Sequence, residues 1–204
     1  MKEIKDKLIT IYPQLIFLIV TFCIFMPSSL FLGNIDQFAV GFAALIPLLM
    51  AASLITAAVV ILIGLIVPKK ICNIYAAVIF GGALAAYVQG NFLNPDFGVL
   101  NGRQIQWSQF RVNAIISTVL WIVLIVVPPV IVCFKKDIMT NIIKWGSLFL
   151  SSIQVVTLVV LIVSSKRSVD YSYVVTKNDE FALSSQGNVV VFIVDTLDND
   201  DAQN

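Results

Sequence analysis

The chain has 204 residues, of which 59% are hydrophobic and only 12% are charged. A soluble domain is close to half apolar and a quarter charged, so this composition indicates a protein whose main solvent is lipid. The net charge of +1 gives no reason to expect a nucleic-acid partner. Because the chain has no histidine, Ser-His-Asp catalysis, Cys-His catalysis and histidine-ligated zinc are excluded from this stretch.

Five segments are apolar for the length of about 20 residues that a helix needs to cross a bilayer. We therefore predict an α-helical membrane protein whose transmembrane domain covers residues 1–164. Lysines precede the first segment, but its apolar run is too long for a signal peptide, so we expect it to stay as an anchor. The predicted spans are 11–32, 38–67, 71–89, 112–134 and 142–163.

Several features within the spans predict how the helices behave. Span 38–67 is longer than a bilayer core requires, so it should tilt or leave one end among the headgroups. Pro128 and Pro129 should kink or finish the fourth helix. Small residues suit close helix packing in the second and third spans, namely Ala51, Ala52, Ser53, Ala57, Ala58, Gly81 and Gly82. The expected state of Cys23, Cys72 and Cys133 is that of buried free thiols.

The lysines predict the topology. Because cytoplasmic loops carry an excess of Lys and Arg, their placement favours a cytoplasmic N-terminus and, with five spans, an extracytoplasmic C-terminal tail. Residues 90–111 then form an external loop and residues 165–187 an external linker. The lysines that five spans place on one side are Lys2, Lys5, Lys7, Lys69, Lys70, Lys135, Lys136 and Lys144.

The tail contains a second kind of pattern. Six apolar, mostly β-branched residues run from Val189 to Val194, which is typical of a strand buried on both faces of an α/β sheet. Asp195 follows at its carboxyl end, where such sheets bind ligands and where a carboxylate suits a divalent cation. A turn or helix cap is the alternative role for Asp195. A strand of this kind needs neighbours, so we expect residues 188–204 to begin an α/β domain of a longer protein, truncated here.

The string NVVVFIVDTLD at 188–198 resembles the opening strand of the alkaline phosphatase/sulfatase superfamily. Five spans before such a domain are similar to the architecture of lipoteichoic acid synthases and phosphoethanolamine transferases. The closest resemblance is to membrane-anchored sulfatase-like hydrolase/transferases of bacterial surface-polysaccharide loci, whose loop the stretch QGNFLNPDFGVLNGRQIQWSQF also resembles. The resemblance implies a multi-pass protein of the bacterial plasma membrane.

The resemblance also implies a chemistry. Asp195 matches the family's first metal-binding carboxylate, and the cofactor implied for the complete protein is a divalent cation, either Mn, Mg, Ca or Zn. Thr196 stands where many sulfatases have a second acidic residue, which favours the transferase-like branch. The family's nucleophile lies further along, so no catalytic residue is expected in these 204 residues and they should be inactive alone. The implied partners are membrane lipids and a lipid-linked or polysaccharide substrate carrying a phosphate or sulfate ester.

Two other interpretations stay open. In the first, the chain is a non-enzymatic membrane scaffold or a small transporter-like module. In the second, it is the product of a prematurely ended reading frame. Transporters place ionisable groups inside the bilayer, and the predicted spans have none at mid-depth. Their most polar residues there are Gln14, Gln89 and Gln154, with Lys144 near one end of the fifth span.

Overall fold

The computed structural model describes residues 2–35, 38, 40–95 and 106–165. In these residues, five helical rods are long and apolar enough to cross a membrane, as predicted. A helix suits hydrocarbon because it satisfies all its backbone polar groups within one segment. The rods are Lys2–Gly33, Phe42–Ile66, Lys69–Leu93, Trp107–Phe134 and Lys136–Ser164.

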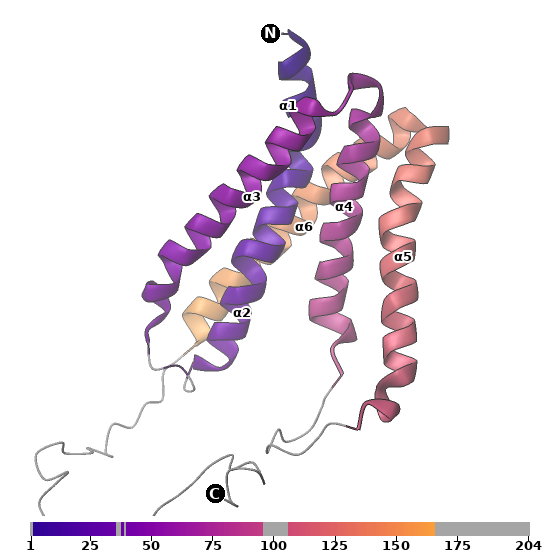
Figure 1. The fold of residues 1–204 in the computed structure, drawn as a ribbon. Coiled ribbons are helices and arrows are strands. Elements are labelled where there is room, and N and C mark those ends of the chain that lie inside the picture. The colour runs from indigo at the N-terminus through magenta and orange to yellow at the C-terminus, as the bar shows by residue number, and fades with distance from the viewer. Residues whose placement is uncertain (1, 36–37, 39, 96–105, 166–204) are drawn as a thin grey trace, which may run out of the picture. The chain divides into compact units, whose positions relative to one another are not determined.

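Short 3-10 and π segments join or extend the α-helices of these rods (Figure 1). The first rod consists of α1 (Lys2–Leu18), the π-helix η1 (Ile19–Phe25) and α2 (Met26–Gly33). The second and third consist of η3 (Phe42–Leu45), α3 (Ile46–Ile66), η4 (Lys69–Ile71), α4 (Cys72–Val88) and η5 (Gln89–Leu93). The last two consist of η6 (Trp107–Phe110), α5 (Arg111–Phe134) and α6 (Lys136–Ser164).

The first and third rods form the centre of the bundle. In its most apolar stretch, each is 50% buried, whereas the second, fourth and fifth rods are 11%, 11% and 17% buried. One core cluster joins α1, α4, α5 and α6 around Phe17 and Phe80, whose ring centroids are 5.9 Å apart. A second joins α1, α3 and α4 around Ile11 and Val60. The outer helices keep most of their apolar surface for lipid, which costs nothing in a bilayer.

The second span is shorter than predicted. Its helix begins at Phe42 rather than at Phe38, because Gly41 is extended (φ −80°, ψ 158°). Pro47 lies in the first turn of α3, where a missing N–H leaves no intrahelical bond unmade. The rod of 25 residues is therefore closer to the thickness of a bilayer core, although it still needs some tilt.

Pro128 and Pro129 do not finish the fourth helix, since α5 continues to Phe134. Pro128 has no N–H to offer the carbonyl of Leu124, and a proline inside a membrane helix is tolerated where neighbours compensate. The Leu124 oxygen lies against Gly81 of α4, so the freed carbonyl faces the Cα of a neighbouring helix. Pro128, which was expected to kink or finish α5, thus lies one turn from the contact between α5 and Gly81.

The small residues differ in what they do. Gly81 packs tightly on α5, and a Cβ there would also lie 3.0 Å from the Ile125 Cα. Gly82 has nothing within 4 Å of such a Cβ, so the predicted packing role is wrong for it. In α3 the close approach is at Gly64, where an added Cβ would lie 2.5 Å from Ile11 Cδ1, whereas Ala51 and Ala58 of the predicted stretch are exposed.

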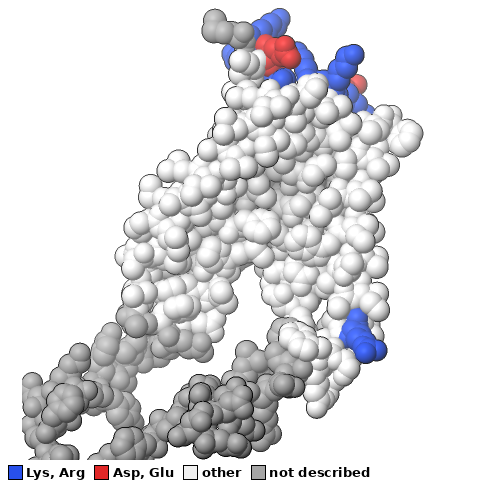
Figure 2. Space-filling view, viewed as in Figure 1, with Lys and Arg blue, Asp and Glu red and all other residues white. Residues whose placement is uncertain are grey.

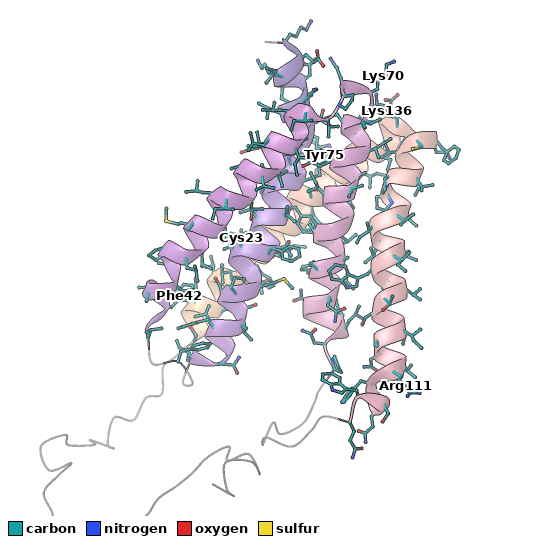
Figure 3. All side chains as sticks on the ribbon, in the orientation of Figure 1. Cys23, Phe42, Lys70, Tyr75, Arg111 and Lys136 are labelled. Carbon is teal, nitrogen blue, oxygen red and sulfur yellow. The ribbon has the colours of Figure 1, made fainter. Side chains whose placement is uncertain are left out.

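Charge gathers at one end of the rods, as Figure 2 shows. Lys70 and Lys136 lie at that end and Arg111 lies at the other (Figure 3). The same end holds most of the acidic residues of the described chain, and Lys69 Nζ pairs with Asp6 Oδ2 at 2.7 Å. The first rod starts at this lysine-rich end, so five crossings bring Ser165, where the described chain stops, to the opposite end.

Candidate functional site

Asp195, the predicted metal ligand, lies outside the described residues. The predicted strand in 188–204 lies outside them too, as does the linker 165–187 apart from Ser165. In the described part of the chain, no three His, Cys, Asp or Glu side chains come close enough to hold a metal ion.

Both ends of the predicted loop 90–111 are helical instead. Gly90–Leu93 continue the third rod as the end of η5, and Trp107–Phe110 form η6 at the start of the fourth. The side chain of Gln89 helps to extend the third rod: its Oε1 accepts from Trp121 Nε1 at 3.2 Å, and its Nε2 donates to Asn94 Oδ1 at 3.2 Å. Trp107 is exposed, as expected of an aromatic residue at a membrane interface.

A cavity of about 400 Å³ opens between α2 and η5, at the end away from the lysines. In Figure 2 the surface is hollowed between the two lobes at this end. We call it the asparagine cavity, and it is lined by Phe25, Met26, Ser29, Leu30, Asn34, Gly90, Asn91 and Asn94. Two of its lining residues approach closely, because a Cβ added at Gly90 would lie 2.7 Å from the Met26 Cε.

The three asparagines hold their helix ends in the same way. Asn34 Nδ2 donates to Leu30 O at 2.9 Å, and Asn91 Nδ2 donates to Tyr87 O at 2.7 Å. Asn94 Nδ2 donates to Gly90 O at 3.4 Å. Each bond satisfies a carbonyl near a helix end, where intrahelical partners run out. An amide has two N–H groups and an acceptor oxygen, so each side chain keeps capacity for a ligand.

The asparagine cavity is lined by uncharged residues, some polar and some apolar. The asparagine amides and the Ser29 hydroxyl offer donors and acceptors, and none of its lining residues is charged. Phe25, Met26 and Leu30 supply the apolar wall. This combination suits a hydroxyl-bearing group, such as a sugar or glycerol, attached to a lipid chain, and it does not suit a bare metal ion.

Deeper in the bundle, polar side chains meet across helices instead of lining a cavity. Gln154 Nε2 of α6 donates to Thr21 Oγ1 of η1 at 3.0 Å, and both residues are fully buried. Cys23 Sγ lies 3.4 Å from Thr56 Oγ1 of α3. Both contacts use the π-helical turn of the first rod, whose wider spacing is common at specialised positions. Cys23 and Cys72 are buried free thiols as predicted, whereas Cys133 is exposed.

Sequence reasoning missed the asparagine cavity. Asn91 and Asn94 belong to residues 90–111, which were predicted only as an external loop, and Asn34 follows the predicted first span. Each residue sits near the end of its rod on the side away from the lysines, and that position was available from the predicted topology. Their convergence was not, because it depends on which rods are neighbours.

No family model, curated protein or solved structure matches the chain. The resemblance of residues 188–198 to a sulfatase-like strand therefore stands on those residues and on the order of the parts.

Proposed function

We propose that this chain is the membrane part of a bacterial cell-envelope hydrolase/transferase of the sulfatase-like type. In this proposal the rods anchor the protein and bring a lipid-linked substrate to a catalytic domain that begins near Asn188. The reaction transfers or releases a phosphate- or sulfate-bearing group, and Asp195 is one ligand of a divalent metal that polarises the ester. The N-terminus is cytoplasmic and the tail extracytoplasmic.

The observation that carries the proposal is the position of the asparagine cavity. It lies at the end of the bundle where α6 finishes at Ser164, which is also the end from which the chain continues toward Asp195. The cavity and residues 166–204 are thus expected on the same side of the membrane. A neutral, hydroxyl-binding hollow beside lipid is what an enzyme acting on lipid-linked sugars or glycerol phosphates requires.

The first test is the mass of the native gene product. An antibody against the segment around Trp107 should detect, in membranes of the source cell, a band much larger than the 22.4 kDa of this chain. Such a band means that a further domain follows Asp195. A band at 22.4 kDa contradicts the enzyme proposal and favours the scaffold or transporter-like alternative.

The second test uses the native protein in detergent with a soluble probe, bis(p-nitrophenyl) phosphate, and with added Mn²⁺, Mg²⁺, Ca²⁺ or Zn²⁺ in turn. Asp195→Asn should abolish metal-dependent turnover because one ligand of the metal is lost. Asp201→Asn, a nearby acidic residue, is the matched control and should retain it. Equal activity in both variants would remove Asp195 from the metal site.

The third test separates the asparagine cavity from the reaction centre. Asn91→Leu should lower turnover of a fluorescent phosphatidylglycerol while leaving turnover of bis(p-nitrophenyl) phosphate unchanged, because only the lipid uses the cavity. Asn113→Leu, on α5 outside that cavity, should change neither. A parallel loss of both activities in Asn91→Leu would mean that the residue acts through folding, and the cavity would lose its proposed role.

A further inference from the structure

Two adjoining hollows lie at the lysine-rich end of the bundle, opposite the end that holds the asparagine cavity. A polar hollow of about 210 Å³ opens between α1, α4 and α6. An apolar groove adjoins it along α1 and α6, and Ile9, Pro13 and Lys144 line both. The polar residues of the first are Thr10, Gln14, Asn73, Thr140, Asn141 and Lys144, and the groove adds Leu8, Tyr12 and Leu148.

Lys144 is the only charged residue that lines either hollow. Within the described residues it has no carboxylate at ion-pair distance, since the ion pairs found there join Lys7 to Glu3 and Lys69 to Asp6. Its ammonium lies 5.4 Å from the ring centroid of Trp145, which leaves its hydrogen-bonding capacity free. Lys144 is exposed, and a lysine on the wall of a hollow with no carboxylate beside it can bind an anion.

The depth of the site matches the boundary between headgroups and acyl chains. Lys144 follows Lys136, the first residue of α6, by two turns, which is about 12 Å along the helix axis. Tyr12 beside the groove and Trp145 next to Lys144 are both exposed, and such aromatic side chains mark the membrane interface. Lys144 therefore lies at the level where lipid phosphates are found, while the groove continues into the acyl layer.

The polar hollow also contains neutral hydrogen-bonding groups that are not used within the described chain. In the described chain, the amides of Asn73 and Asn141 make no hydrogen bond with another residue, and each offers two N–H donors. Pro13 leaves the carbonyl of Ile9 without its usual partner, so an acceptor for a hydroxyl lies beside the amide donors. Donors and a cation suit a phosphate, and the acceptor suits a headgroup hydroxyl.

We propose that these hollows form a binding site for one anionic glycerophospholipid of the leaflet at the lysine-rich end. The phosphate binds Lys144 and the asparagine amides, and an acyl chain occupies the groove between Tyr12 and Leu148. A free phosphate ion would leave the apolar groove unused. The site is independent of the proposed enzymatic function, because it lies at the other end of the rods and involves no residue of the asparagine cavity.

The test is native mass spectrometry of the purified full chain titrated with dimyristoyl phosphatidylglycerol, with dimyristoyl phosphatidylcholine and with inorganic phosphate. Phosphatidylglycerol should bind most tightly, with one molecule per chain at this site in addition to the one that the asparagine cavity holds under the proposed function. Lys144→Gln should weaken that binding about fivefold, the effect of one basic residue near an anionic lipid. Lys70→Gln, which removes an exposed lysine of the same end, is the matched control and should leave binding unchanged.

Two further variants keep the test decisive if Lys144→Gln fails to fold. Asn141→Asp places a carboxylate at an exposed position of the polar hollow and should weaken phosphatidylglycerol binding by repulsion. Leu148→Trp should fill the groove and weaken binding of both lipids. Equal losses in Lys70→Gln and Lys144→Gln would mean diffuse attraction to a charged surface and would overturn the site. So would inorganic phosphate binding as tightly as the lipid.

Discussion

Gly81 and Gly82 are neighbours on α4 whose surroundings differ completely. A methyl group at Gly81 would meet the Leu124 carbonyl oxygen and the Ile125 Cα, which are backbone atoms that cannot swing aside, whereas Gly82 faces open space. We predict that Gly81→Ala lowers the free energy of unfolding by about 1–3 kcal/mol, the usual cost of overpacking. Gly82→Ala should raise it by up to about 1 kcal/mol, because alanine favours helix over glycine.

Equilibrium unfolding of the two variants in mixed detergent micelles, followed by circular dichroism, gives both values. The pair is matched in chemistry and in helix, so it separates packing from propensity. Equal effects at the two positions would mean that α4 and α5 do not approach as closely as the structure has them.

Thr21 and Gln154 form a buried polar pair between η1 and α6. The Gln154 carbonyl oxygen has no hydrogen-bond partner among the described residues, so the bond from Nε2 to Thr21 satisfies only the other half of the amide. Thr21→Val should lower stability by about 0.6–1.7 kcal/mol, the range measured for such bonds in membranes. The double variant with Gln154→Leu should be more stable than the sum of the single variants predicts, because no amide is then left unpaired.

A double-mutant cycle of Thr21→Val and Gln154→Leu measures this coupling. Additive effects would show that the two side chains do not interact.

At the scale of elements, the end of α3 is held by α1. Lys7 is buried and its Nζ donates to Leu65 O, 3.1 Å away, one of the carbonyls that the last turn of α3 leaves unbonded. Tyr75 of α4 donates from Oη to Val60 O at 2.9 Å and binds the same helix one turn earlier. Three rods thus share one polar contact region near the lysine-rich end.

We predict that Lys7→Met lowers the free energy of unfolding by about 1–2 kcal/mol, because a charged donor at the carboxyl end of a helix is lost while the methylene stem is kept. Lys5→Met is the control, since Lys5 is exposed, and it should have little effect. The measurement is again unfolding in micelles. A similar change in both variants would reduce the role of Lys7 to general surface charge.

The elements also show how far the sequence could predict this fold. Each of the five spans follows from its apolar run, because hydrocarbon admits few other structures. The π-helix at Ile19–Phe25 was not predictable, since its composition is that of any buried helix and its contacts, with Thr56 and Gln154, are made to other helices. For Pro128 and Pro129 the sequence allowed a kink or an end of the helix, and the continuation of α5 to Phe134 excludes the end. The sequence could not show that the Leu124 carbonyl lies against Gly81, a residue of another helix.

The same limit holds for the candidate sites. Asp195 could be predicted as a metal ligand from the sequence because its motif is a short continuous stretch. The role stays a prediction because Asp195 lies outside the described residues. The asparagine cavity and the hollows around Lys144 draw on different rods, so the sequence shows their residues without their grouping. Lys144 was noted only as a charge near the end of a span, and the groove beside it made it a candidate.

At the scale of the whole molecule, charge asymmetry is the feature from which the orientation of the protein is predicted. The lysine-rich end has a polybasic surface on one side of the membrane, and Arg111 is the basic residue that Figure 3 places at the opposite end. The two proposals are compatible, since the lipid proposed to bind near Lys144 belongs to one leaflet and the asparagine cavity lies at the opposite end of the rods. The hollows around Lys144 and the asparagine cavity are then expected to lie in different leaflets.

This arrangement predicts which positions a membrane-impermeant maleimide reaches in intact cells. In a variant whose three native cysteines are replaced by alanine, Arg111→Cys should be labelled directly, because its end faces outward when the N-terminus is cytoplasmic. Lys70→Cys, exposed between α3 and α4, should be labelled only after the membrane is permeabilised. The opposite pattern would mean that the N-terminus is extracytoplasmic. Asp195 would then be cytoplasmic, on the side of the membrane that holds no envelope substrate. Labelling of both positions in intact cells would mean that one rod does not cross.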